Sequence, residues 1–116
     1  MTESPIIESY HAHIYYDSTT RPIAARIRAD IERQFTVVMG RWREEPVGPH
    51  PQSMYQVAFE NAEFAKLVPW LMVNRDGLDI LVHPNTGDAY EDHATYRLWL
   101  GRPLPLRLET LRDAAD

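Results

Sequence analysis

Alternation of apolar and polar side chains in two stretches, residues 10–16 and 53–60, constrains the fold more than any other feature of this chain. Successive side chains of a β-strand point to opposite faces, so the alternation predicts strands that cover a core with one face only. Residues 35–42 and 78–83 are rich in β-branched, aromatic and aliphatic residues and predict two more strands. We therefore expect a sheet whose second face is solvated, covered by a partner or used for function.

Helical segments separate these strands. Between residues 20 and 35, isoleucine recurs at positions 23, 27 and 31, which is the spacing of one helix face. A second stripe of apolar residues follows Asn61 and ends before Gly77, a residue suited to the end of a helix. A third, short helix is predicted to begin after a capping residue, Asp88, and to end before Gly101.

The order β-α-β-β-α-β is that of a ferredoxin-like α+β fold. We expect an antiparallel sheet with both long helices on one face and an extra C-terminal helix. Right-handed crossovers place the first and third strands in the middle, where we expect them to run parallel, and place the fourth beside the first in the opposite direction. Since no repeat or linker interrupts the pattern, residues 1–116 are expected to form one domain, with its core at about 8–101 and a tail at 102–116.

Composition excludes several classes of function. The 116 residues carry a net charge of −5, whereas a nucleic-acid-binding surface is basic. No apolar run approaches the roughly 20 residues that span a bilayer, and the first residues lack the basic and apolar regions of a signal peptide. We therefore expect a cytoplasmic protein that binds neither nucleic acid nor membrane. The absence of cysteine excludes disulfides, thiolate nucleophiles and zinc–thiolate sites.

Histidines mark the face of the sheet that the helices leave free. His11 and His13 alternate with the apolar residues of the first strand. His50 precedes the third strand, and His83 closes the fourth. In the expected topology, the start of the first strand, the start of the third and the end of the fourth share one edge, so these four side chains are expected to converge. His93 lies in the predicted third helix, where its position alone indicates an exposed residue.

A cluster of imidazoles suits a metal ion or acid–base chemistry. Fe(II), Zn(II), Cu(II) and Ni(II) all accept such ligands, and a non-heme iron site often adds one carboxylate. Asp88, Asp92 and Glu60 are the candidate carboxylates, although a helix cap, a surface acid and a strand end explain them equally well. Taken singly, each histidine is also explained as a polar residue of a strand, loop or helix surface. Three arginines are candidates for binding a substrate carboxylate, although a position on the solvated surface is the expected explanation for them: Arg41, Arg43 and Arg75.

Five stretches form a distinctive series over about residues 8–101: HAHIYY, VGPHP, YQVAF, LVPWLMVNRDGLDILVHPNTGD and DHATYRLWLG. With them, the sequence resembles the DOPA 4,5-dioxygenase family of aromatic ring-cleaving enzymes, and residues 74–88 are the most specific part. The resemblance implies a small ferredoxin-like domain, forming a homodimer, that uses non-heme Fe(II) and molecular oxygen to open a catechol ring outside its two hydroxyl groups. It carries functional roles onto the histidines of the motifs: His11, His13, His50, His83 and His93.

A catechol such as DOPA would chelate the metal, so the site needs free coordination positions and a histidine that transfers protons. We expect His11, His50 and His83 to hold the metal. His13 is the first candidate for proton transfer, and His93 is the second. Two other classes of function would use the same residues. A Zn(II)-dependent hydrolase or isomerase would work without oxygen, and a dimeric ferredoxin-like binding module would place the histidines in its subunit contact.

Overall fold

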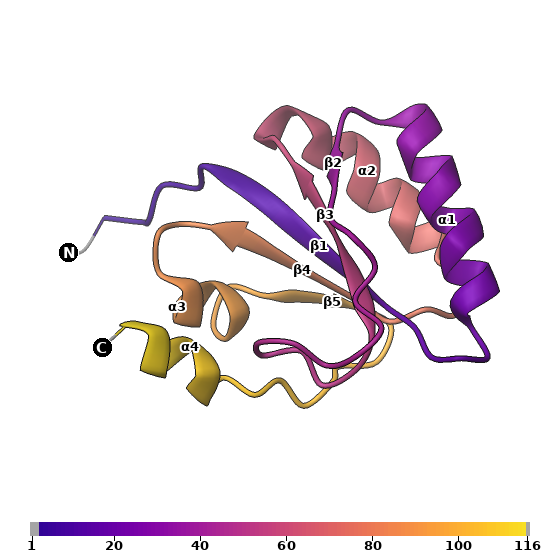
Figure 1. The fold of residues 1–116 in the computed structure, drawn as a ribbon. Coiled ribbons are helices and arrows are strands. Elements are labelled where there is room, and N and C mark those ends of the chain that lie inside the picture. The colour runs from indigo at the N-terminus through magenta and orange to yellow at the C-terminus, as the bar shows by residue number, and fades with distance from the viewer. Residues whose placement is uncertain (1–2, 116) are drawn as a thin grey trace.

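The computed structural model describes residues 3–115, and this part of the chain forms an α+β fold with a five-stranded antiparallel sheet and four helices (Figure 1). The strands are β1 (Ser9–Tyr15), β2 (Val38–Met39), β3 (Met54–Phe59), β4 (Ile80–Asn85) and β5 (Leu98–Leu100). The helices are α1 (Arg21–Gln34), α2 (Asn61–Asn74), α3 (Ala89–His93) and α4 (Glu109–Ala115). None of these helices has the length and apolarity that crossing a membrane requires.

β1 lies in the centre of the sheet, whose order is β2-β3-β1-β4-β5. As predicted, its neighbours in the sheet are β3 and β4. The expectation that β1 and β3 run parallel is wrong, because they pair antiparallel, with His13 opposite Gln56. The crossover through α1 leaves a gap of one strand between β1 and β2, and β3 turns back from β2 to fill that gap in the opposite direction. This reversal changes which strand ends meet, and it decides how His50 reaches the other histidines.

The strand expected over residues 35–42 is much shorter in the structure. Only β2 pairs regularly with β3, and an isolated bridge between Arg43 and Met54 follows it. The residues between these two contacts leave the regular ladder, although their composition favours a strand. A local irregularity of this kind depends on the partner strand, and the pattern of residues 35–42 contains no signal for it.

The third helix is also shorter than expected, because it ends at His93 and does not reach Gly101. The chain then returns to the sheet as β5, an edge strand that pairs antiparallel with β4. Leu100 lies opposite Ile80 in this pair, and both side chains join the main core. Burial of apolar surface against the sheet therefore outweighs the helical reading of this segment.

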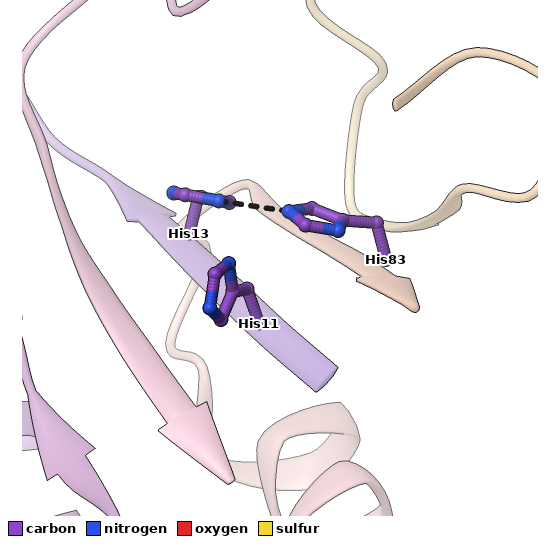
Figure 2. A group of neighbouring side chains, drawn as sticks. All are labelled: His11, His13 and His83. Carbon is purple, nitrogen blue, oxygen red and sulfur yellow. Dashed lines mark hydrogen bonds between the residues drawn. The ribbon is translucent and has the colours of Figure 1, made fainter. Parts of the chain in front are cut away.

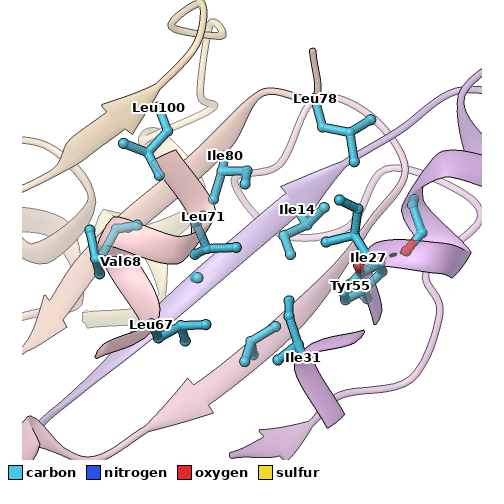
Figure 3. Close-up of a cluster of buried hydrophobic side chains, with 14 of the residues drawn as sticks. Ile14, Ile27, Ile31, Tyr55, Leu67, Val68, Leu71, Leu78, Ile80 and Leu100 are labelled. Atoms are coloured by element: carbon cyan, nitrogen blue, oxygen red, sulfur yellow. Dashed lines mark hydrogen bonds between the residues drawn. The ribbon is translucent and has the colours of Figure 1, made fainter. Parts of the chain in front are cut away.

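Both long helices, α1 and α2, cover one face of the sheet, as predicted (Figures 1 and 3). The main core lies between them and the inward side chains of the strands, including Ile14, Val57, Ile80, Ile27, Ile31, Leu67 and Leu71. The C-terminal tail contacts the other face, where Leu104 and Leu106 pack against Tyr15 and Leu81. The second face is therefore covered in part by the chain itself, and the histidines lie beside this smaller apolar cluster.

Candidate metal centre

Three histidines meet on the central strands, on the face opposite α1 and α2 (Figure 2). His11 and His13 alternate with Ala12, which belongs to the main core, so their rings point away from the helices. His83 on β4 lies directly opposite His11 in the strand register. The ring centroids of His11 and His83 are 5.2 Å apart, and those of His13 and His83 are 5.1 Å apart. The predicted convergence of these three side chains is confirmed.

His50 reaches the cluster by a route that the sequence did not predict. β3 begins opposite the end of β1, with Met54 paired to Tyr15, so the start of the first strand and the start of the third lie at opposite ends. The expectation that the starts of the first and third strands share one edge of the sheet is therefore wrong. The loop before β3 instead folds over the sheet, and His50 places its ring centroid 4.1 Å from that of His13. The backbone N–H of Arg107 in the tail donates to the carbonyl of Pro49 at 2.8 Å and holds this loop in place.

His93 also joins the cluster, which contradicts its interpretation as an exposed helix residue. It is half-buried, and its ring centroid lies 4.0 Å from that of His83. The Asp88 side chain caps α3 by accepting from the backbone N–H of Glu91, so the helix starts directly after the turn that follows β4. This cap, visible in the sequence, was the signal that α3 begins close to the end of β4.

The outer nitrogens of three rings are held by hydrogen bonds. His83 Nδ1 donates to the Pro84 carbonyl at 2.9 Å, and His93 Nδ1 donates to the Ala89 carbonyl at 2.7 Å. His50 Nδ1 shares a hydrogen bond of 2.7 Å with the hydroxyl of Tyr15. Histidines that bind metals characteristically have their second nitrogen bonded in this way, because the bond fixes the ring and leaves the other nitrogen for the metal. The donor set therefore fits a metal ion.

His13 has an unusual arrangement at the centre of the cluster. Its Nε2 lies 3.1 Å from Nε2 of His83. Because His83 already donates through Nδ1, its neutral ring can only accept at Nε2, so His13 is the donor and keeps its lone pair on Nδ1. That Nδ1 is buried and has no hydrogen-bond partner among residues 3–115. A buried polar atom without a partner costs about 1–3 kcal/mol, and a bound ligand would remove that cost.

Two groups of three histidines bring their nitrogens within 4.8 Å of one another: His11, His13 and His83, and His13, His50 and His93. His13 belongs to both groups. The expected ligand set of His11, His50 and His83 is not among the groups found in the described part of the chain. No carboxylate belongs to either group: Asp88 caps α3, and buried Asp92 accepts from the backbone N–H of Thr86 at 3.0 Å. An all-histidine centre therefore agrees best with the geometry.

Burial keeps the clustered imidazoles neutral. Burial first, and the neighbouring His93 second, lower the pKa of His50 to about 4 and that of His83 to about 3. The pKa of His13 is also lowered well below its ordinary value. Burial is the largest cause, and the surrounding imidazoles lower this pKa as well. Neutral rings are the form that binds a metal, so the cluster is ready to bind near neutral pH without first releasing protons.

We predict that the metal-free protein loses stability below pH 6.5. The unfolded chain binds protons at its histidines near that pH, whereas folded His50 and His83 do so only near pH 4 and 3. The free energy of unfolding should therefore fall between pH 7 and 5, by on the order of 2 kcal/mol for each of these histidines. Urea unfolding in a chelator measures this slope, and His50→Gln should flatten it. An unfolding free energy unchanged from pH 7 to 5 would contradict the prediction.

Tyr15→Phe is expected to weaken metal binding about 10- to 100-fold while leaving the fold intact. The substitution removes the hydroxyl that orients His50 and keeps the buried ring. Its cost in stability should be about 1 kcal/mol, the typical value of one hydrogen bond. Competition with a chelating dye measures the affinity. Tyr16→Phe is the matched control, because the Tyr16 hydroxyl bonds to Glu44 and not to a histidine. Equal affinity of Tyr15→Phe and the unaltered protein would show that His50 is not a ligand.

An α+β domain with a buried cluster of nitrogen donors defines a candidate metalloprotein. The model of the Dopa 4,5-dioxygenase family matches residues 10–110, and the chain belongs to this family. The resemblance seen in the sequence motifs is thereby confirmed.

Two relatives and one solved structure illustrate the match. A Botryotinia fuckeliana protein described as an "Uncharacterized 21.2 kDa protein" is 34% identical, over 95% of this chain and 67% of that protein. The DOPA 4,5-dioxygenase of Amanita muscaria is 32% identical, over 95% of this chain and 52% of that enzyme, so the chain spans about half of its length. The crystal structure of a "putative dioxygenase" from Nostoc punctiforme has a TM-score of 0.93 at 56% identity, covering 93% of this chain and 94% of that one.

Proposed function

We propose that this protein is a metal-dependent, extradiol-type dioxygenase that opens the ring of a catechol, such as DOPA, with molecular oxygen. The observation that carries the proposal is the cluster of five histidines, three buried and two half-buried, in a member of the Dopa 4,5-dioxygenase family. Fe(II) is the proposed metal, because imidazole ligands with open positions suit it.

We include in the proposal a ferredoxin-like classification of the fold, a cytoplasmic location and a homodimer. Val73 and Met72 on α2, which are 81% and 54% exposed, offer apolar surface for a second copy.

We propose His13, His50 and His93 as the metal ligands. His50 and His93 are oriented through Nδ1 by Tyr15 and by a backbone carbonyl, and His13 is oriented by His83. The alternative group needs His83 as a ligand, and its Nε2 already accepts from His13. A small cavity also reaches this group, because His13 and His50 line it. This set shares only His50 with the set expected from the sequence, His11, His50 and His83.

The remaining histidines then have roles around the substrate. When bound, Fe(II) supplies the Lewis acidity and the electron transfer that ring opening by oxygen needs. His11 is half-buried and has no hydrogen-bond partner among the described side chains, so its lone pair is available to take a phenolic proton from the catechol and return it later. His83 fixes the orientation of His13 through their shared hydrogen bond. Burial of His13 and His50 limits access of water to two of the three proposed ligands.

One experiment tests the function. The protein is loaded with Fe(II) without oxygen, mixed with a catechol and then exposed to oxygen. The proposal predicts uptake of one oxygen molecule for each catechol and a coloured semialdehyde product. Turnover with Zn(II) under argon would instead indicate a hydrolase or isomerase. Failure to take up any metal would indicate a binding module in which the histidines serve subunit contact.

A further inference from the structure

A cavity of about 170 Å³ opens beside His13 and His50. Its other lining residues are Gly40, Arg41, Arg43, Val47, Met54 and Gln56. A larger cavity of about 400 Å³ contacts the cluster only at His83 and lies mainly against apolar residues such as Phe64 and Val82 on the helix side. The smaller cavity is therefore the one that combines two histidines with charged and amide side chains.

An irregularity between β2 and β3 shapes this cavity. The backbone N–H of Gly40 donates to the Gln56 carbonyl at 2.8 Å, and the next contact joins Arg43 and Met54 through two hydrogen bonds. Two residues, Arg41 and Trp42, separate these contacts on one strand, whereas only Tyr55 separates them on β3. This count is that of a β-bulge, which redirects side chains and is common beside active sites. The bulge brings both arginines to the cavity wall.

The two arginines are free to bind an anion. Neither Arg41 nor Arg43 forms an ion pair within the described residues, whereas all four arginines of α1 do. The nearby carboxylate of Glu44 is occupied, because Arg21 and Tyr16 both donate to it. The whole protein carries a charge of −5, so two free guanidinium groups beside a cavity form a local positive site that attracts anionic ligands.

Gln56 adds an amide on the same wall. It lies opposite His13 in the strand register, so both side chains point into this face of the sheet. Its amide has no hydrogen-bond partner in the part of the chain that the structure describes. Space for it depends on Gly40, since a Cβ at that position would lie 3.3 Å from the Cβ of Gln56. A side chain at position 40 would therefore crowd the cavity.

We propose that Arg41, Arg43 and Gln56 bind a carboxylate on the substrate, so that the preferred substrates are single-ring catechols with an acidic side chain. This inference rests on the proposed function. Guanidinium groups and an amide donate to the carboxylate, and the catechol ring then extends toward His13 and His50, which line the same cavity. Specificity would come from the charged end of the substrate, and the histidines would act on the ring.

The first test compares two catechols of similar size, 3,4-dihydroxyphenylacetate and uncharged 4-methylcatechol, by kcat/KM. We expect the Fe(II)-loaded protein to favour the carboxylate by about 10- to 100-fold. Arg43→Gln and Arg41→Gln should each remove much of this preference, through KM for the carboxylate, with little change for 4-methylcatechol. Arg33→Gln is the matched control, because Arg33 lies on α1 and pairs with Asp30. Equal kcat/KM for both catechols, or a preference that survives both substitutions, would overturn the inference.

A second test does not depend on ring cleavage. Calorimetry compares the binding of phenylacetate with that of uncharged phenylacetamide to the metal-loaded protein. Stronger binding of phenylacetate that is lost in Arg43→Gln would support the carboxylate site even if no catechol were turned over, in which case only the proposed reaction would fail. Equal binding of both compounds would reject the site, even if ring cleavage were observed.

Discussion

His13→Ala is expected to abolish both metal binding and ring cleavage. His13 belongs to both groups of histidines that can share an ion, so either centre loses a ligand with this substitution. Loss of an outer partner costs about 10- to 100-fold in affinity, and loss of a ligand itself should cost more, at least about 10³-fold. Elemental analysis after dialysis measures the metal, and oxygen uptake with a catechol measures activity.

Stability should respond to His13→Ala much less than metal binding does. The metal-free protein leaves His13 Nδ1 buried without a partner, so removing this ring relieves an unfavourable contact while it opens a cavity. We expect only a small net change in the free energy of unfolding. Ile14→Ala is the matched control on the same strand: it faces the core, should destabilise by about 2–5 kcal/mol and should keep the metal in the folded protein. Retained metal and turnover in His13→Ala would contradict the proposed centre.

Substitution of His93 is expected to weaken metal binding, whereas substitution of His11 is expected to slow catalysis. His93→Ala should lower metal affinity by at least about 10³-fold, because it removes a proposed ligand and not an outer partner. His11→Ala should keep the metal and lower kcat by about 10²- to 10⁴-fold, the usual contribution of a proton-transfer group. Metal stoichiometry and kcat, measured on both variants, separate these roles. Loss of metal from His11→Ala together with retention by His93→Ala would favour a ligand set that contains His11. That set is either the other group, His11, His13 and His83, or the set expected from the sequence, His11, His50 and His83.

The faces of the strands could be predicted from the sequence because alternation is a local property. Ala12 and Ile14 enter the core, and His11 and His13 point to the other face, as the period of two requires. His83 could be placed for the same reason, since its neighbour on β4 is buried against the helices. Local periodicity therefore predicted three of the five histidines of the cluster.

The position of His50 depends on contacts that no local pattern contains, and for His93 the sequence indicated only where α3 begins. His50 reaches the cluster because its loop folds over the sheet and bonds to Tyr15 and the tail, and not because its strand starts at the expected edge. His93 is brought inward because α3 ends early and β5 returns to the sheet. In both cases burial of apolar surface by distant segments decides where a polar side chain lies.

Anomalous diffraction at the iron edge, from crystals loaded with Fe(II) in the absence of oxygen, tests the central claim most directly. We predict one strong peak within bonding distance of nitrogens from His13, His50 and His93, on the side of the small cavity. A peak confined to surface carboxylates, or none near the histidines, would show that the cluster is not a metal centre.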